Sequence, residues 1–257
     1  MHPPPPIATL VDRYSFERVH IGCSGTDVFR LTAANAPPLF LKFDTLFTSS
    51  GLNGEVERLR WLQGRLPVPR VIAFANGDDG DYLLTEAIEG ATGVDAGRDD
   101  PDAVVAALAC SLRSLHAQPI DDCPFDEPLR VWIQRAGERM VSGQVDESDF
   151  DTERRGRSAE DLFRELKNFP PLKHGRAITH GDACLPNIIF GNNFAVVGFV
   201  DCGRAGIADP YQDLALASRS ISSNLGERWV PKFFEAYGLT KVDRQKLRFY
   251  RLLDEFF

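Results

Sequence analysis

The spacing of apolar residues changes once along this 257-residue chain, and that change constrains the fold more than any other feature. In the first third, short apolar and β-branched runs are separated by Gly, Pro and Asn, a pattern typical of strands joined by turns. Such runs occupy residues 28–31, 39–43, 71–74 and 82–85. Between them, Val56, Leu59 and Leu62 recur at helical spacing and predict one helix over residues 54–62.

After Gly90 the pattern becomes mostly helical. Val104, Leu108 and Leu112 share one face of a helix predicted for residues 102–117. Further helices are predicted for residues 129–140, 159–167, 210–221, 227–237 and 243–256, and short strands for residues 177–179, 187–190 and 195–200. We therefore expect an α+β fold with two lobes, a β-rich N-terminal lobe with one helix over residues 1–88 and a mostly helical C-terminal lobe over residues 89–257. The prolines at positions 3–6 predict a mobile N-terminal tail.

Residues 178–190, ITHGDACLPNIIF, carry the strongest chemical signal in the chain. Asp182 and Asn187 lie between strand-like segments, and Asp201 follows at the end of another apolar run. Phosphoryl-transfer enzymes use this order for one carboxylate that orients a hydroxyl and for an amide and a carboxylate that bind Mg²⁺. A single Asp or Asn in a turn more often caps a helix or forms an Asx turn. The three together favour magnesium-dependent phosphoryl transfer.

Lysine usage gives a second, independent signal. The chain has six lysines against 23 arginines, and Lys42 is the only lysine before Lys167. It lies inside the apolar run 39–43, where a charge costs free energy unless it is paired. A lysine in an edge strand often simply faces solvent. The alternative, which we favour, is a compact charge that contacts phosphate oxygens and pairs with Glu55, with Glu57 as the competing partner.

Residues 22–27, GCSGTD, form a weaker candidate for a phosphate-covering loop. They lie between two predicted strands and match neither G-x-G-x-x-G nor a Walker A motif. Backbone N–H groups and the Ser24 hydroxyl are suited to contact phosphates. An ordinary hairpin turn explains the same residues equally well.

Four motifs together give a resemblance to a known family. They are His180-Gly-Asp182 with Asn187, the segment 200–204 (VDCGR), the segment 209–213 (DPYQD) and the C-terminal LLDEFF. The chain resembles the aminoglycoside 3′-phosphotransferases, above all the kanamycin and neomycin type, over about residues 16–257. The first two motifs also occur in choline kinases and other small-molecule kinases. The DEFF terminus and the segment 149–153 (DFDTE) are much more specific.

The resemblance implies a two-lobed protein-kinase-like fold and a role for each matched residue. Asp182 matches the catalytic aspartate that orients the sugar hydroxyl and accepts its proton. Asn187 and Asp201 match the Mg²⁺ ligands, and Lys42 and Glu55 match the lysine–glutamate pair of the ATP site. The remaining matches on the nucleotide side are the loop residue Ser24 and the hinge residues Thr85 and Ala87, whose backbone groups hold adenine. In this interpretation residues 1–88 bind nucleotide, and residues 89–257 carry catalysis and bind the aminoglycoside.

The acidic residues of the chain suit a polycationic substrate. The formal net charge is −8, and aminoglycosides carry several ammonium groups at neutral pH. Carboxylates would attract these groups and accept charge-assisted hydrogen bonds from them. The resemblance implies two acidic sets near the substrate, Asp149, Asp151 and Glu153 in one, Glu255 and the terminal carboxylate of Phe257 in the other. Arg204 is expected to contact phosphate or an acidic residue of this site. Acidic runs are otherwise most often solvated faces.

The histidines and cysteines call for no separate chemistry. His180 is interpreted as a hydrogen-bonding support of the catalytic loop, and His116, at the end of the helix 102–117, as structural. The five cysteines show no metal-ligand spacing and no C-x-x-C pair, which favours reduced thiols in a cytoplasm.

Composition excludes several other classes of protein. No run approaches the ~20 apolar residues of a membrane helix. No cluster of basic residues suggests nucleic-acid binding. We expect a cytoplasmic monomer or weak dimer with no nucleic-acid or membrane partner.

The interpretation that follows is ATP- and Mg²⁺-dependent phosphorylation of an aminoglycoside antibiotic, at its 3′-hydroxyl, giving resistance. Two alternatives remain at this stage. One is a kinase for another small alcohol, such as a macrolide, choline or a sugar. The other is a protein that binds nucleotide or drug without turnover.

Overall fold

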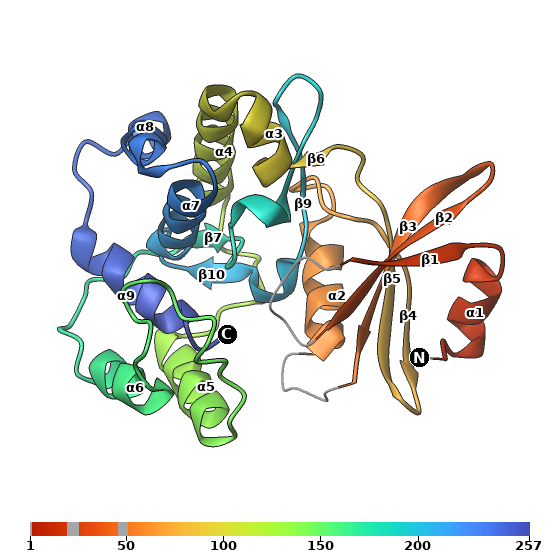
Figure 1. Cartoon of the computed structure of the whole chain (residues 1–257), viewed down its shortest axis with the longest axis horizontal. Coiled ribbons are helices and arrows are strands. Elements are labelled where there is room, and N and C mark those ends of the chain that lie inside the picture. The colour runs from red at the N-terminus through yellow and green to blue at the C-terminus, as the bar shows by residue number, and fades with distance from the viewer. Residues whose placement is uncertain (1, 20–25, 46–50) are drawn as a thin grey trace. The chain divides into compact units, whose positions relative to one another are not determined.

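The computed structural model describes residues 2–19, 26–45 and 51–257. These residues divide into two compact units, one of residues up to Ala96 together with Pro186–Arg204, and the other of Gly97–Leu185 together with Ala205–Phe257. Figure 1 labels the elements of both units. The first unit is β-rich and the second is mostly helical, which confirms the predicted α+β class.

An antiparallel sheet in the order β1-β2-β3-β5-β4 forms the centre of the first unit. Its strands are β1 Ser15–Val19, β2 Asp27–Ala33, β3 Ala36–Asp44, β4 Val71–Gly77 and β5 Gly80–Glu86. Successive side chains of a strand point to opposite faces of a sheet. Leu39, Leu41 and Phe43 therefore share one face of β3 and lie in a buried cluster. Lys42 lies on the other face, toward α2 (Gly51–Leu62).

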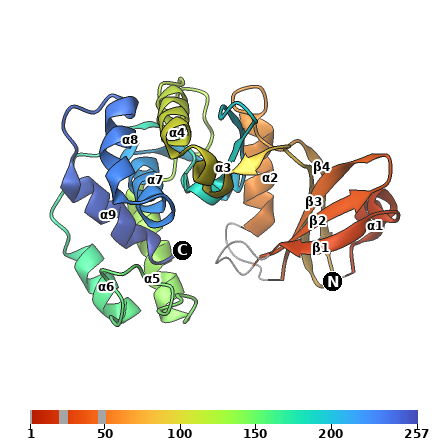
Figure 2. The same cartoon turned by 45° about the horizontal axis from the view of Figure 1, so that its top comes forward.

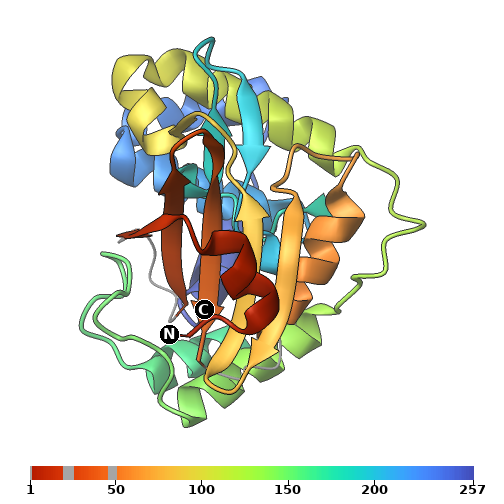
Figure 3. The ribbon, with the colours of Figure 1, turned by 90° about the vertical axis from the view of Figure 1, so that its right-hand side faces the viewer.

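Helix α1, Pro5–Val11, covers the apolar face of this sheet. Figure 3 shows it lying across the strands, and its Ile7 and Val11 are buried in the same cluster as Leu41. The predicted mobile tail at residues 3–6 is therefore wrong beyond Pro4. Proline favours the first turn of a helix, because its fixed φ suits the helix and its missing N–H has no partner there anyway. Pro5 and Pro6 begin the helix in this way.

A second, smaller sheet of the first unit is ordered β6-β8-β9. Its strands are β6 Ala91–Thr92, β8 Ile188–Phe190 and β9 Val196–Phe199, flanked by the 3₁₀ turns η1 Leu185–Asn187 and η2 Cys202–Arg204. The Phe199 N–H donates to the Pro67 carbonyl at 2.8 Å, which ties β9 to the segment before β4. Turn η2 packs against α2.

Six helices described in the second unit follow the predicted periodicity closely. They are α4 Pro101–His116, α5 Leu129–Val141, α6 Ala159–Lys167, α7 Tyr211–Asn224, α8 Val230–Tyr237 and α9 Arg244–Asp254. Helix α4 packs against α8, and α7 packs against α9, as Figure 2 shows. Asp100 caps α4 by accepting a hydrogen bond from the Ala103 N–H, and Asp243 caps α9 in the same way.

The remaining elements of the chain are short. Strands β7 Ala177–Thr179 and β10 Gly206–Ala208 pair in antiparallel fashion. Helix α3, Gly93–Asp99, and the turn η3, Glu227–Trp229, complete the described elements. Within the described ranges no helix combines the length and hydropathy of a membrane span. The cysteines that the structure describes, at positions 110, 123, 184 and 202, form no disulfide with one another.

Candidate functional site

Lys42 lies between two carboxylates in the first unit. Its Nζ is 2.8 Å from both carboxylate oxygens of Glu55 and 3.0 Å from Oδ1 of Asp201. The side chains of Lys42 and Glu55 are only 18% and 5% exposed, whereas that of Asp201 is 47% exposed. Burial acts to lower the pKa of Lys42, but Asp201 and Glu55 outweigh it and raise the pKa above the usual value of lysine. Lys42 therefore stays an ammonium group, beside a carboxylate that reaches solvent.

The structure shows which of the two candidate glutamates, Glu55 or Glu57, pairs with Lys42. Glu55 is buried on the face of α2 that meets the sheet, while Glu57 is exposed, and its Oε1 accepts from Asn53 at 3.4 Å. Two positions along a helix turn a side chain to a different side. Lys42 thus pairs with Glu55.

Asn187 and Asp201 lie at the open end of the β8–β9 hairpin. The Val200 N–H donates to the Asn187 carbonyl at 2.9 Å. Asp201 therefore lies one residue beyond the last hydrogen-bonded pair of the two strands. Asp201 has φ 59°, a left-handed conformation uncommon for residues other than glycine.

The side-chain oxygens of Asn187 and Asp201 suit a hard divalent cation as ligands. One carboxylate and one amide oxygen are what Mg²⁺ takes from a protein when phosphates and water supply its other ligands. Among the residues described here, no three His, Cys, Asp or Glu side chains gather to hold a metal ion by themselves. The pair therefore fits a Mg²⁺ that arrives with a nucleotide.

Thr85 and Ala87, the predicted hinge residues, lie at the end of β5 and just after it. Thr85 is buried and pairs with Phe40 in the sheet. The Ala87 N–H donates to the Pro38 carbonyl at 3.1 Å. An adenine contact through this N–H would have to replace that bond. Ser24 lies outside the described residues.

The loop that carries Asp182 begins where β7 ends, in the second unit. The N–H groups of His180 and Gly181 both donate to the Asp213 carboxylate of α7, each at 2.8 Å. Gly181 has φ 88°, which favours glycine at this position. The Nδ1 of His180 accepts from the Asp182 N–H at 3.2 Å, which agrees with the interpretation of His180 as a support of the loop.

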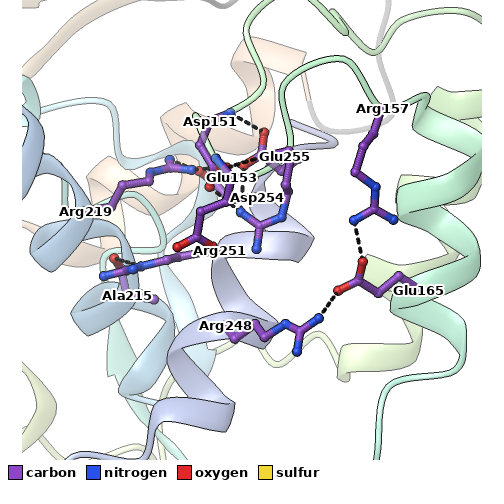
Figure 4. Close-up of polar contacts among 11 residues, drawn as sticks. Asp151, Glu153, Arg157, Glu165, Ala215, Arg219, Arg248, Arg251, Asp254 and Glu255 are labelled. Atoms are coloured by element: carbon purple, nitrogen blue, oxygen red, sulfur yellow. Dashed lines mark hydrogen bonds and ion pairs between the residues drawn. The ribbon is translucent and has the colours of Figure 1, made fainter.

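Arg154 neutralises part of the negative charge of the acidic residues 149–153. Its Nη1 contacts the Asp151 carboxylate and lies 3.2 Å from Oε1 of Glu255. The side chains of Arg154 and Glu255 are 4% and 3% exposed. The Asp151 N–H also donates to Glu255, at 3.2 Å, so the loop and the C-terminal segment are joined directly (Figure 4).

Arg219 of α7 compensates the C-terminal acids from another side. It forms an ion pair with Asp254 and approaches Oε1 of Glu255 to 3.7 Å. Burial raises the pKa of Glu255 to about 7, and the nearby Asp151 carboxylate acts in the same direction. Asp149 and Glu153 are exposed.

Phe257 and Arg204, the other two predicted substrate-side residues, have different neighbours from Asp151 and Glu255. The Phe257 ring contacts the Trp132 ring of α5 edge to face, with centroids 5.3 Å apart. Arg139 of α5 donates to the Phe256 carbonyl at 2.5 Å. Arg204 ends η2, in the same unit as Asp201.

Comparison with known proteins identifies the family. The model of the phosphotransferase enzyme family matches residues 15–250. The chain belongs to the phosphotransferase enzyme family. An aminoglycoside 3′-phosphotransferase of Escherichia coli is 38% identical over 95% of this chain and 91% of its own length. An aminoglycoside 3′-phosphotransferase of Streptomyces fradiae is 36% identical over 95% of this chain and 96% of its own length.

A solved structure confirms the two-lobed fold of this phosphotransferase. An aminoglycoside-3′-phosphotransferase of type VIII matches with a TM-score of 0.86 and 37% identity, covering 98% of this chain and 97% of that one. The predicted resemblance to this family is thereby confirmed.

Sequence analysis missed two contributors to the site of this phosphotransferase. Asp213, quoted only as part of a motif, holds the backbone of the Asp182 loop. An aspartate directly before the apolar run 214–217 of a helix, where it is fully buried, is the signal that could have found it. Arg154 lies directly beside the acidic set, but no pattern of charges predicts that it turns inward.

Proposed function

We propose that this phosphotransferase transfers the γ-phosphoryl group of ATP to the 3′-hydroxyl of an aminoglycoside antibiotic. The observation that carries the transfer chemistry is the Lys42 ammonium group held between Glu55 and Asp201. The names of the relatives, aminoglycoside 3′-phosphotransferases at 36–38% identity, support the acceptor.

On the nucleotide side, Lys42 contacts the α- and β-phosphates while Glu55 holds it in place. Asn187 and Asp201 would hold Mg²⁺, which neutralises charge on the phosphate oxygens. When Asp201 binds the metal it would give up its contact with Lys42, which would leave the ammonium group free for the phosphates. Ser24 completes the phosphate contacts, and the backbone at Thr85 and Ala87 holds adenine.

On the acceptor side, Asp182 orients the attacking hydroxyl and accepts its proton. The ammonium groups of the drug bind the exposed carboxylates Asp149 and Glu153. Asp151 and Glu255 offer less free charge, because Arg154 already contacts both. Arg204 and Phe257 complete this side.

The product explains a resistance function. An aminoglycoside binds RNA through its positive charges, and a phosphate group adds close to two negative charges at neutral pH. The modified drug is therefore repelled by the phosphates of its target.

The test is ADP release from MgATP with kanamycin as the acceptor, in wild type and in Asp182→Asn. We expect release that depends on kanamycin and falls by about 10²- to 10⁴-fold in the variant, while MgATP binding is retained. The matched control is Asp126→Asn, an exposed aspartate paired with Arg176, which should keep wild-type turnover.

Other outcomes would redirect the proposal. Near-normal turnover in Asp182→Asn would contradict the assigned mechanism. Release with neutral alcohols but not with kanamycin would indicate a different small-molecule kinase. MgATP binding with no acceptor-dependent release would indicate a binding protein without turnover.

A further inference from the structure

A buried chain of hydrogen bonds lies behind the Asp182 loop in the second unit. It begins at Asp213, whose side chain has no exposure to solvent. Oδ1 accepts from the Gly181 N–H, and Oδ2 accepts from the His180 N–H and meets Nε2 of His116 at 3.0 Å. Both carboxylate oxygens therefore hold the backbone immediately before Asp182.

His116 extends this chain to a second helix. Its Nδ1 lies 2.8 Å from the Tyr237 hydroxyl, and its side chain is 4% exposed. His116 is the last residue of α4 and Tyr237 the last residue of α8, two helices that pack against each other. The two rings meet edge to face, with centroids 5.6 Å apart.

The chemistry of the groups sets the direction of these bonds. A carboxylate only accepts, so Nε2 of His116 carries the proton that faces Asp213. Burial raises the pKa of Tyr237 to about 12, so its hydroxyl keeps a proton that it can donate to Nδ1. Burial also acts to raise the pKa of Asp213, but the hydrogen bonds from His116 and from the His180 N–H outweigh it and keep the pKa below the usual value of aspartate.

We propose that His116 and Tyr237 are positioning residues for phosphoryl transfer, acting through Asp213 on the backbone that aims Asp182. This inference rests on the proposed function. The torsional preference of χ2 in aspartate is broad, so the hydrogen bonds of Asp213 set the orientation of its carboxylate. His116 supplies the third of these bonds, from a different helix, and strengthens that hold.

The conformation of the loop explains why such fixing matters. Gly181 adopts φ 88°, and Gln212 of α7 donates to its carbonyl at 3.1 Å. Glycine reaches this conformation without strain but reaches other conformations as easily, so the hydrogen bonds to Asp213 and Gln212 select it. Loosening Asp213 would therefore shift Asp182 by a fraction of an ångström or more, without removing any group that touches substrate.

The experiment compares two side chains of similar size at position 116. His116→Gln keeps a side-chain N–H that can reach Asp213, whereas His116→Leu fills the space without a donor. Two quantities are measured in each purified variant. One is kcat and KM with MgATP and kanamycin, and the other is the hydrogen-exchange rate of the His180 and Gly181 amides, which does not require turnover.

We expect His116→Leu to lower kcat by roughly ten- to hundredfold while both KM values stay within about twofold. The His180 and Gly181 amides should exchange faster in the same variant. His116→Gln should restore most of kcat and of the amide protection. Tyr237→Phe, which removes one hydroxyl from the chain of bonds, should lower kcat by about two- to tenfold and keeps the test decisive if His116→Leu does not fold.

A matched control separates this effect from general loss of packing. His174 also contacts a tyrosine, with Nδ1 2.9 Å from the Tyr250 hydroxyl, but the Asp182 loop is not among its partners. His174→Leu should therefore leave kcat and the exchange of the two loop amides unchanged.

Wild-type exchange and kcat in both His116→Leu and Tyr237→Phe would overturn the inference. So would faster amide exchange with an unchanged kcat. If wild type shows no turnover with kanamycin, the proposed function fails, while faster amide exchange in His116→Leu would still demonstrate that His116 holds the loop.

Discussion

Replacing Glu55 with glutamine tests the role of the Lys42 pair. Glutamine has the size of glutamate but no charge, and its amide offers Lys42 one acceptor where Glu55 offers two. The pair is largely buried, with side chains 18% and 5% exposed and both Nζ–Oε distances at 2.8 Å. Glu55→Gln therefore leaves the Lys42 ammonium group in place while removing its buried counter-ion.

The magnitude follows from what remains around Lys42. Removing one partner of a buried ion pair costs about 3–5 kcal/mol. Asp201 stays 3.0 Å from Nζ and compensates part of the charge, although at 47% exposure it does so partly in solvent. Because of this compensation we expect the free energy of unfolding to fall by about 2–3 kcal/mol, at or just below the low end of that range.

Nucleotide binding should weaken for a related reason. Without the Glu55 carboxylate, Asp201 is the one carboxylate that still contacts Lys42 in the described part of the chain, so Lys42 competes with Mg²⁺ for it. Losing about 1.4 kcal/mol of interaction raises Kd tenfold, so we expect Kd for MgATP to rise by roughly tenfold.

Urea denaturation and titration of MgATP measure the two effects. The control is Glu57→Gln on the same helix, because Glu57 is exposed and lies away from Lys42. The reasoning would be refuted if Glu55→Gln matched Glu57→Gln in both unfolding free energy and Kd.

Two further predictions concern the acidic residues around Arg154. Glu255 has its pKa raised to about 7 in the folded chain, so its protonated form favours folding; this contribution is present at low pH and is lost as pH rises through about 7. If kanamycin binds only the ionised carboxylate, its KM should fall by about tenfold more between pH 6 and 8 in wild type than in Glu255→Gln, and equal pH profiles would contradict the assignment. Arg154→Met leaves Asp151 beside Glu255 without their shared buried cation and should lower the unfolding free energy by about 3 kcal/mol. The exposed neighbour provides the control in Arg155→Met, and equal stability of the two variants would count against a structural role for Arg154.

Most of the fold could be predicted because periodicity reports directly on burial. The helix predicted for residues 159–167 is α6, and that predicted for 129–140 ends within one residue of α5. Helix α1 was missed because four consecutive prolines suggest an extended tail. Its stability comes from Ile7 and Val11 packing on the sheet, a tertiary contact that no local pattern contains.

The Lys42–Glu55 pair could be anticipated because a scarce residue type lay in an unusual setting. The compensation of Asp151 and Glu255 could not. Arg154 is one of 23 arginines, and its burial depends on Glu255, which lies far along the sequence. For the same reason His116 could only be interpreted as structural, since its partners Asp213 and Tyr237 lie 97 and 121 residues away.

The roles predicted for Ser24, Thr85, Ala87 and Arg204 stay predictions. The division of nucleotide and acceptor functions between residues 1–88 and 89–257 also stays a prediction. Each concerns a bound molecule, and sequence patterns specify which groups are available without specifying which of them a ligand uses.

The most direct test of the central claim compares two aminoglycosides that differ at the reacting position. ADP release from MgATP is measured with kanamycin, which has a 3′-hydroxyl, and with tobramycin, which lacks it. The account predicts release with kanamycin and none above background with tobramycin. Equal release with both would place the phosphoryl group on a different hydroxyl, and release with neither would contradict the proposed activity.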